Sequence, residues 1–454
     1  MSDIIAAIST ALAPSGVGIV RLSGWGCALL ADQIIKPVSG IPLAEAPNRK
    51  LVLSDLYDRQ GRVIDRILAV HSRGPHSYTG EDTVELQCHG SPAVLRETME
   101  HLLLKGARQA GPGEFTKRAF LNGTMDLTAA EAVIDLIEAE TTNAAANAAG
   151  QVGGALLRKL EPVYDTLVSI MSHFHAVLDY PDEDIDDFKM QDYVMTLESQ
   201  QAVLAALLAT AQRGNVVKNG IKTVILGRPN AGKSSLLNAL LGYDRAIVTE
   251  IPGTTRDTLE EKVRLGDLLL RVQDTAGIRD TQDVVEKMGV ERSIAAAKDA
   301  DLALVVIDAS VPLTGEDLSI LDMVKNARCV MAVRNKCDLP QAESGLPLPD
   351  YAHSVDISAK TGQGIDRLTA AVEAAFQDDI GQDETLLTNL RHVTAITEAL
   401  GGITAAQDAM NAGLSPDMVL VNVEEALHAI GGVIGKSMRE DITNDIFSRF
   451  CVGK

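Results

Sequence analysis

The stretch GRPNAGKSS, Gly227 to Ser235, constrains this chain more than any other segment of its 454 residues. It follows the β-like run KTVIL, opens the apolar run SSLLNALLG, and fits the pattern G-x-x-x-x-G-K-[S/T]. In that pattern glycines let backbone N–H groups turn inward around phosphate oxygens, and Lys233 brings a positive charge to the β- and γ-phosphates. Ser234 offers a hydroxyl to Mg²⁺. The segment therefore predicts a nucleotide-binding loop between a strand and a helix.

Further motifs follow in the order that a GTP-binding domain requires. GTTRD places Thr255 to complete the Mg²⁺ shell, and DTAG (Asp274–Gly277) ends a β-like run, where a metal-shell aspartate belongs. NKCD (Asn335–Asp338) ends another strand-like run, and SAK (Ser358–Lys360) completes a base pocket. Asp338 can accept two N–H bonds from a guanine edge, and adenine lacks that donor pair. The set predicts GTP rather than ATP. The predicted nucleotide contacts are Asn230, Ala231, Gly232, Lys233, Ser234, Ser235, Thr249, Glu250, Ile251, Pro252, Gly253, Thr254, Thr255, Asp274, Thr275, Ala276, Gly277, Asn335, Lys336, Asp338, Ser358, Ala359 and Lys360.

Hydrolysis of GTP needs an oriented water molecule. The residue after DTAG is Ile278, which cannot hydrogen-bond water, so another acid or amide must act. The following stretch offers Asp280, Asp283, Glu286 and Glu291. Arg256 and Arg279 are candidates by position for a positive charge at the phosphates. A monovalent cation is the alternative, because Asn230 carries a side-chain carbonyl oxygen inside the phosphate loop.

The rest of the chain divides around this nucleotide-binding segment. Residues 1–120 mix short alternating runs such as VGIVRLSG, RILAVHS and DTVELQCHG with a helix-like PAVLRETMEHLLLKGA, which predicts an N-terminal α/β domain. Residues 121–214 and 383–454 read as helices, with Thr128 and Glu131 spaced as a capping box. Residues 215–382 alternate strand-like and helical runs, as in a mostly parallel sheet wrapped by helices. The simplest architecture is an α/β GTPase domain inserted into a helical domain.

The charge of the chain argues against non-specific nucleic-acid binding, and its cysteines indicate a reducing compartment. The formal net charge is −21, but residues 1–120 carry 13 Lys and Arg against 12 Asp and Glu. Because non-specific nucleic-acid binding depends on Lys and Arg contacts to phosphate, a polyanion would need a local site or a partner protein. Five scattered cysteines fit a reducing cytoplasm. The N-terminus does not resemble a secretory signal, and no run approaches 18 uninterrupted apolar residues, so we expect a cytoplasmic protein with no membrane span.

Motifs along the whole chain carry a family resemblance. They include GVGIVRLSG, SYTGEDTVELQCHGSP, GPGEFTKRAFLNG, LDYPDEDID, IPGTTRD, DTAGIRDTQDVVEKMGVER and the terminal FCVGK. With the phosphate loop, they resemble the MnmE (TrmE) family of tRNA-modification GTPases. The resemblance implies a folate-binding and dimerising N-terminal domain ahead of a helical domain that holds the inserted GTPase domain.

The resemblance also implies roles within the GTPase domain. Glu286 matches a glutamate that orients the attacking water and acts as general base. Asn230 matches a potassium ligand in the phosphate loop, and Thr249, Ile251 and Thr254 match a loop that closes over the ion. Ser234 and Thr255 would hold Mg²⁺. Potassium would then stand where an arginine finger stands in related enzymes.

In the N-terminal domain the resemblance implies binding of 5,10-methylene- or 5-formyl-tetrahydrofolate. Arg21 and Glu85 match folate-contacting positions; the guanidinium suits the glutamate tail of the folate, and the carboxylate suits its aminopyrimidine edge. Thr124 stands where the family often has a lysine, so a contact from that side chain would lose its charge. Cys88 and His89 are adjacent in sequence. We expect Cys88 to pack in the interior at a strand end, rather than to form a metal-binding or nucleophilic pair with His89.

The implied reaction needs partners. With the flavoprotein MnmG, which carries FAD, the family adds an aminomethyl or carboxymethylaminomethyl group to C5 of the wobble uridine of certain tRNAs, with a tetrahydrofolate as one-carbon source. The resemblance also implies a homodimer and GTP hydrolysis that is stimulated by potassium. The alternative is a GTPase switch or ribosome-assembly factor without one-carbon chemistry.

The last five residues, FCVGK, end the chain with an unusual composition for a free terminus. Apolar positions in the preceding helix-like stretch predict that this tail is held against the protein. The resemblance places Lys454 and its terminal carboxylate at the folate. Cys451 is a possible participant in the one-carbon chemistry, although no activating base is identifiable nearby in sequence.

Overall fold

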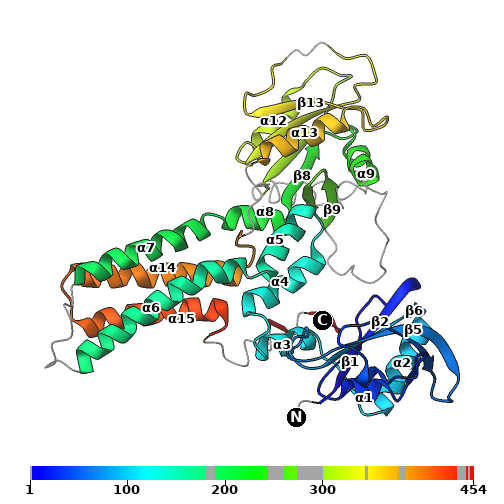
Figure 1. The fold of residues 1–454 in the computed structure, drawn as a ribbon. Helices are drawn as coiled ribbons and strands as arrows, with labels where there is room; N and C mark the ends of the chain where they lie inside the picture. The colour runs from blue at the N-terminus through cyan, green and yellow to red at the C-terminus, as the bar shows by residue number, and fades with distance from the viewer. Residues whose placement is uncertain are drawn as a thin grey trace. The chain divides into compact units, whose positions relative to one another are not determined.

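The computed structural model describes residues 3–179, 190–243, 260–273, 300–342, 346–377, 385–436, 446–447 and 450–453 (Figure 1). Two compact units result. Unit 1 comprises Met1–Ile134, Gly150–Gln201 and Ala395–Lys454, and unit 2 comprises Asp135–Ala149 and Ala202–Thr394. This division is coarser than the predicted domains 1–120, 121–214, 215–382 and 383–454, which stay a prediction.

A seven-stranded sheet forms the N-terminal part of unit 1, in the order β3-β4-β5-β6-β2-β1-β7. Its strands pair antiparallel except β1 with β7, which is parallel. The strands are β1 (Ile5–Ile8), β2 (Ser15–Ser23), β3 (Ile35–Pro37), β4 (Val52–Tyr57), β5 (Val63–Ser72), β6 (Thr83–Gly90) and β7 (Arg108–Gln109). The accompanying helices are α1 (Cys27–Ala31), the 3₁₀ turn η1 (Leu43–Glu45), α2 (Pro92–Leu104) and α3 (Glu114–Leu121).

Alternation of apolar and polar residues explains how this sheet is covered. On β2 and β6 every second side chain is buried, including Val20, Leu22 and Leu86, and these pack with Leu95 and Leu102 of α2. The prediction of strands in this region and of a helix beginning at a proline is confirmed. The predicted packing role of Cys88 is confirmed too, because the side chain is buried and desolvation raises its pKa to about 12.

Four long helices form a bundle that belongs mostly to unit 1 (Figure 1). They are α6 (Ala155–Asp179), α7 (Met190–Leu208), α14 (Leu390–Asn411) and α15 (Pro416–Ile434). Helix α6 packs along α15, and Gln201 and Gln407 hydrogen-bond across the α7–α14 pair to Thr404 and the Val194 carbonyl. Buried residues recur at helical spacing, as in Leu160 and Leu167, so each helix presents one apolar stripe to its neighbours.

Two shorter helices, α4 (Leu127–Glu138) and α5 (Thr142–Val152), follow the N-terminal part. The predicted capping box of Thr128 and Glu131 is wrong. Asp126 caps α4 instead, because its carboxylate accepts hydrogen bonds from the backbone N–H of Thr128 at 2.8 Å and of Ala129 at 3.1 Å. Helix α4 begins at Leu127, so Thr128 is already its second residue and Asp126 occupies the N-cap position.

The sheet of unit 2 has six strands in the order β13-β12-β11-β8-β10-β9, all parallel to their neighbours except β9 with β10. The strands are β8 (Ile221–Gly227), β9 (Glu260–Leu265), β10 (Leu268–Gln273), β11 (Leu302–Asp308), β12 (Cys329–Asn335) and β13 (Ala352–Asp356). The helices are α8 (Ala211–Asn219), α9 (Lys233–Tyr243), α12 (Gly315–Met323) and α13 (Ile365–Ala375).

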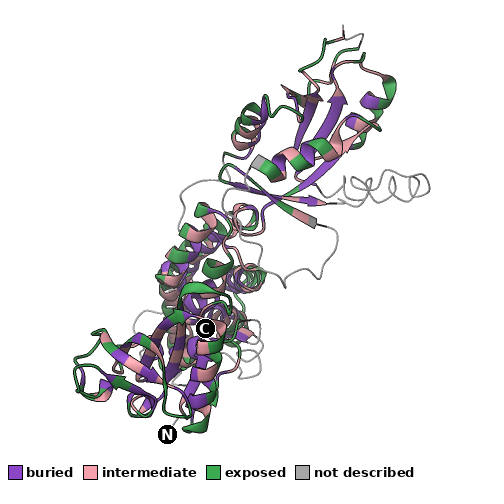
Figure 2. Ribbon diagram, turned by 90° about the vertical axis from the view of Figure 1, so that its right-hand side faces the viewer, coloured by how far each residue is buried: buried purple, intermediate pink, exposed green. Residues whose placement is uncertain are grey.

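Both faces of this sheet are covered, and its strands are largely buried, as the purple ribbons in Figure 2 show. Leu236 of α9 and Leu368 of α13 belong to one core cluster with alternate residues of β8, β11 and β12. Leu321 of α12 belongs to a second cluster on the opposite residues of the same strands. Continuous apolar strands such as LALVVID follow from this two-sided burial. The predicted fold class, α/β units with a helical part, is confirmed.

One described segment, Met190–Asn219, is long and apolar enough by length and composition to cross a membrane, with a mean hydropathy of 1.2 in its best window. Core helices of water-soluble proteins meet the same criterion. Here Val194 and Leu197 are buried while Asp192 and Glu198 are exposed, which is the pattern of a helix packed on one side. The absence of a membrane span stays an expectation.

Candidate functional site

The predicted phosphate loop lies between β8 and α9, in the strand–loop–helix context that its motif requires. The loop turns through left-handed backbone conformations, with φ of +147° at Gly227, +61° at Asn230 and +102° at Gly232. Helix α9 begins at Lys233, so its first N–H groups and its positive dipole end face the loop. The geometry is that of an anion-binding cradle.

Two glycines of the loop are required by close approach as well as by conformation. A Cβ added at Gly232 would lie 2.2 Å from Nδ2 of Asn335, and one at Gly227 would lie 2.3 Å from the carbonyl oxygen of Val306. Both distances are shorter than any normal non-bonded contact. The loop therefore sits against β11 and the end of β12, where only glycine fits.

Lys233 is placed inside the loop. Its Nζ donates hydrogen bonds to the carbonyl oxygens of Gly227 at 2.8 Å and Arg228 at 3.0 Å. Burial lowers the pKa of this ammonium group, because water is partly excluded from the charged form. The arrangement concentrates one positive charge within the ring of backbone N–H groups, as phosphate binding needs.

Asn335 joins two loops at the carboxyl edge of the sheet. Its side chain is buried, Nδ2 donates to the carbonyl oxygen of Ala231 at 2.9 Å, and Oδ1 accepts from the N–H of Ala359 at 2.9 Å. Asn335 thus ties the phosphate loop to the predicted base-binding loop that begins at Ser358. The sequence predicts Asn335 as a nucleotide contact, and the structure shows a side chain whose hydrogen-bonding atoms are engaged by protein backbone.

Lys336 follows with φ of +68° and pairs with a residue that the sequence reasoning missed. Its Nζ lies 2.5 Å from Oδ2 of Asp308 at the end of β11. Burial alone would raise the pKa of Asp308, but Lys336 and Ser310 outweigh it and hold that pKa below its usual range. The signal in the sequence was an aspartate directly after the apolar run LALVVI. Asp338 is exposed two residues further on, next to the loop of Ser358–Lys360 that Asn335 holds.

Several predicted residues lie outside the described part of the chain. They are Thr249, Glu250, Ile251, Pro252, Gly253, Thr254, Thr255, Asp274, Thr275, Ala276, Gly277, Glu286 and Lys454. Their predicted roles in closing over a cation, holding Mg²⁺, orienting water and meeting a folate stay predictions.

A second candidate site lies in unit 1, on neighbouring strands. Arg21 of β2 and Glu85 of β6 are opposite one another in the antiparallel register, and Arg21 Nη2 lies 2.9 Å from Glu85 Oε1. The two side chains are 17% and 30% exposed, so the pair is partly open to a ligand. The structure therefore brings together the two residues that the sequence predicts as folate contacts.

Two aromatic rings frame this pair and were missed from the sequence. The Arg21 guanidinium lies 5.4 Å from the ring centroid of Tyr78 and 5.8 Å from that of Phe115, within cation–π range. The Tyr78 hydroxyl is 2.9 Å from that of Thr116. Both rings occur within the motifs SYTGEDT and GPGEFT, but nothing local in the sequence indicates that they meet over one arginine.

Thr124 lies beside the same site. Its hydroxyl donates to the carbonyl oxygens of Tyr78 at 3.1 Å and Ala119 at 2.9 Å. The side chain therefore links α3 to the segment that carries Tyr78, and it is exposed. A contact from Thr124 to a folate stays a prediction.

The C-terminal tail reaches the same part of unit 1. Phe450 is buried with Phe447, their ring centroids 5.4 Å apart, and Val452 forms an antiparallel bridge with Pro112. The carbonyl oxygen of Gly453 accepts a hydrogen bond of 3.0 Å from Ser9, directly after β1. Packing of the tail is thus confirmed for its described residues 450–453. Cys451 is exposed and its carbonyl oxygen accepts from the N–H of Gly113 at 3.3 Å.

Two known protein families match consecutive parts of the chain. A profile described as the GTP-binding protein TrmE N-terminus matches residues 4–124, and one described as the MnmE helical domain matches residues 127–451. The tRNA modification GTPase MnmE of Roseiflexus sp. (strain RS-1) is 42% identical over 468 residues, covering 100% of this chain and 99% of that protein. The protein of the same name from Clostridioides difficile (strain 630) is 40% identical over 459 residues, with 100% of each chain covered.

Among solved structures, a variant of Aquifex aeolicus Era bound to GDP·AlF4⁻ is 28% identical over 40% of this chain and 66% of that chain, with a TM-score of 0.27. The assignment rests on the full-length relatives and not on this partial likeness. On the identity that spans the whole chain, the protein belongs to the MnmE family of tRNA-modification GTPases and is a GTP hydrolase.

Proposed function

We propose that this GTPase is stimulated by potassium and acts with the flavoprotein MnmG, which carries FAD, to modify the wobble uridine of certain tRNAs at C5. The product would carry an aminomethyl or carboxymethylaminomethyl group whose one-carbon unit comes from methylene-tetrahydrofolate. The observation that carries the one-carbon part is the Arg21–Glu85 pair, framed by Tyr78 and Phe115.

The nucleotide part of the proposal rests on the cradle of unit 2. Gly227 and Gly232 let the loop pack against β11 and Asn335, and Lys233 and the start of α9 supply positive charge, so the site suits phosphate groups. Mg²⁺ prefers oxygen donors, and we assign it to Ser234 at the start of α9 with Thr255. The guanine base is assigned to Asp338 and to the Ser358–Lys360 loop.

Potassium is assigned to the side-chain oxygen of Asn230, with Thr249, Ile251 and Thr254. Asn230 is exposed in the loop at φ +61°, and its amide oxygen is a donor that suits a hard cation. A bound cation there would stabilise charge that develops at the phosphates. Glu286 is assigned the role of orienting the attacking water.

Replacing K⁺ by Na⁺ is expected to lower GTP hydrolysis by about tenfold or more, because the smaller Na⁺ fits oxygen ligands placed for K⁺ poorly and the positive charge is then not held near the phosphates. Asn230→Ala is expected to hydrolyse GTP slowly in both salts. The measurement is phosphate release at constant ionic strength, with Asn219→Ala as a control on an exposed helix residue. Equal rates of the unaltered protein in K⁺ and Na⁺ would remove the potassium assignment.

A folate fits the donor set of the second site. Glu85 can accept from the N–H groups of a pterin edge, Arg21 can donate to oxygen acceptors, and Tyr78 offers a ring face. The sequence assigns Arg21 to the glutamate tail and Glu85 to the aminopyrimidine, which are opposite ends of the ligand. Side chains only 2.9 Å apart meet the same part of a molecule, so we now assign both to one end.

The charge of the chain bears on how it binds tRNA, and its exposed apolar surface bears on dimerisation. The chain is strongly acidic, so we assign tRNA recognition to a local surface together with MnmG. A homodimer is supported by Leu53 and Leu68, which lie opposite one another on β4 and β5 and are 45% and 39% exposed. We propose a cytoplasmic location.

One experiment tests the proposal against its rival, a GTPase switch or assembly factor without one-carbon chemistry. Wobble nucleosides are measured by mass spectrometry in tRNA from a strain that lacks the gene, with and without this protein. We expect the C5 modification to return with the protein. Unchanged nucleosides, together with no binding of 5-formyl-tetrahydrofolate to the purified chain, would favour the rival.

Cys451→Ser is expected to leave wobble modification unchanged. Cys451 is exposed. The tail is held by hydrogen bonds to the backbone carbonyl oxygens of Cys451 and Gly453, and these bonds do not involve the Cys451 sulfur. The measurement is the same nucleoside assay, with folate affinity measured in parallel. Loss of modification at unchanged folate affinity would assign the thiol a chemical role.

A further inference from the structure

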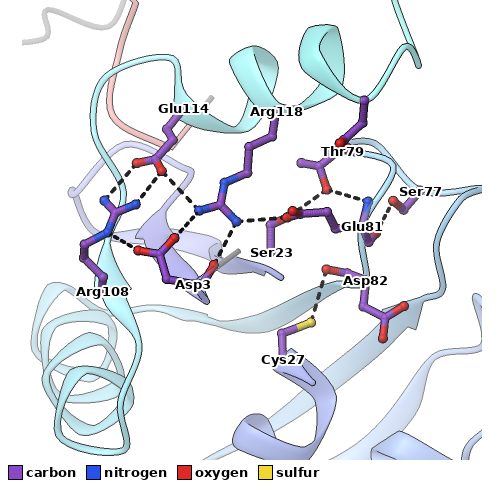
Figure 3. A network of polar contacts seen from close by, with 11 residues as sticks. Asp3, Ser23, Cys27, Ser77, Thr79, Glu81, Asp82, Arg108, Glu114 and Arg118 are labelled. Atoms are coloured by element: carbon purple, nitrogen blue, oxygen red, sulfur yellow. Dashed lines mark hydrogen bonds and ion pairs between the residues drawn. The ribbon is translucent and has the colours of Figure 1, made fainter. Parts of the chain in front are cut away.

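A network of charged side chains lies next to the Arg21–Glu85 pair, and Arg118 of α3 is at its centre (Figure 3). Arg118 Nη1 donates to Glu81 Oε2 at 2.9 Å, and Nη2 donates to Asp3 Oδ1 at 2.7 Å and to Glu114 Oε1 at 3.2 Å. Its side chain is only 11% exposed. Burial alone would lower the pKa of Arg118, but Glu81 and the other carboxylates outweigh it and raise that pKa. The guanidinium is thus permanently charged and fixed.

The network continues from Glu81 into strand β2. Oε2 of Glu81 also accepts from the hydroxyl of Ser23 at 3.1 Å, and that hydroxyl is 2.7 Å from the one of Thr79. Ser23 and Thr79 are fully buried, and Glu81 is 6% exposed. Ser23 lies two residues after Arg21, on the same strand. Figure 3 shows Arg118, Glu81, Ser23 and Thr79 converging on one point between α3 and the segment 77–82.

This segment carries Tyr78, whose ring lies against Arg21. The end of α3 holds the segment on its other side: Asn122 Nδ2 donates to the carbonyl oxygen of Thr79 at 2.7 Å, and Thr124 donates to that of Tyr78 at 3.1 Å. These hydrogen bonds fix the backbone of Tyr78 and Thr79, and with it the position from which the Tyr78 ring lies over Arg21.

We propose that Arg118 is a positioning residue of the folate site: through Glu81 and Thr79 it holds the segment 77–82 so that the Tyr78 ring faces the Arg21–Glu85 pair. The inference rests on the proposed one-carbon function and goes beyond it. Arg118 touches no reacting atom. Its effect on ligand binding passes through Tyr78, because Tyr78 is the member of the segment that lies over Arg21.

The test is a double-mutant cycle on the full chain, with 5-formyl-tetrahydrofolate as the probe and equilibrium dialysis as the measurement. Arg118→Met is expected to raise the dissociation constant about tenfold, within the range of coupling between residues of one network. In a Tyr78→Ala background the same change is expected to raise it by less than about twofold. Arg118→Lys, which keeps the charge, is expected to recover part of the affinity.

Arg59 supplies a matched control. It also pairs with two carboxylates, Glu97 at 2.8 Å and Glu100 at 3.0 Å, in the same part of unit 1 but away from Tyr78. Arg59→Met is expected to leave the dissociation constant unchanged. Circular dichroism and thermal unfolding check that unit 1 is folded in each variant, and GTP hydrolysis checks unit 2.

Glu81→Gln tests the same link if Arg118→Met does not fold, because Glu81 is the side chain through which Arg118 reaches the segment 77–82. It keeps the shape of the side chain and removes the charge that pairs with Arg118, and it is expected to weaken folate binding in the unaltered chain but not in a Tyr78→Ala background. The positioning role is overturned if Arg118→Met binds as tightly as the unaltered chain, or if its effect is equally large without the Tyr78 ring. If the unaltered chain binds no folate, the proposed function fails first and this inference with it.

Discussion

Asn335→Ala is expected to lower the affinity for GTP by about 100-fold. The substitution leaves the carbonyl oxygen of Ala231 and the N–H of Ala359 without their partner, and each buried group left unpaired costs about 1–3 kcal/mol. A loss of about 2.7 kcal/mol in binding corresponds to the expected factor. The phosphate loop and the base-binding loop would no longer be held in one geometry, so phosphate and base contacts weaken together.

Calorimetric titration with a non-hydrolysable GTP analogue measures this effect. Asn219→Ala is the matched control, because Asn219 Nδ2 donates to Asn215 on an exposed helix surface, and no change is expected there. GTP affinity within about threefold of the unaltered chain in Asn335→Ala would show that the two loops hold their positions without the bridge.

Arg21→Met is expected to abolish wobble modification and to weaken binding of 5-formyl-tetrahydrofolate by about 100-fold, with GTP hydrolysis retained. The methionine keeps most of the volume of the side chain but removes the ion pair to Glu85 and the cation over Tyr78 and Phe115. Charge-assisted hydrogen bonds contribute about 1.5–3 kcal/mol each, which is enough for this loss.

The control for Arg21 lies on the same sheet. Arg66 pairs with Asp55 across β4 and β5 at 2.8 Å, but its side chain is 63% exposed and no aromatic ring is recorded over it in the described chain. Arg66→Met is expected to keep folate binding and tRNA modification, because exposed ion pairs contribute little. Folate binding by Arg21→Met equal to that of the unaltered chain would place the ligand elsewhere.

The two predicted sites differ in how much the sequence could say about them. The phosphate loop is a local structure: nine consecutive residues from Gly227 to Ser235 contain the glycines, the lysine and the helix start, so its strand–loop–helix form follows from the motif. The predicted cap of α4 was wrong because Asp126 and Thr128 are both good N-cap residues, and only the start of the helix at Leu127 distinguishes them.

The folate site is a product of tertiary structure. Arg21 and Glu85 are 64 residues apart and meet because β2 and β6 pair in one particular register. A shift of one strand by one residue would place the two side chains on opposite faces of the sheet. Tyr78 lies in a loop and Phe115 in a helix, so no spacing in the sequence predicts that both rings lie near Arg21.

The sequence by itself determined the GTPase chemistry, the parallel sheet that presents it, and the family, since those depend on short motifs and on apolar periodicity within single elements. Only the tertiary structure decided that Asn335 bridges two loops, that Asp308 holds Lys336, and that Arg118 anchors the segment carrying Tyr78. The physical reason is that hydrogen bonds and ion pairs between distant residues depend on strand register and helix docking, which are fixed by burial of the whole core.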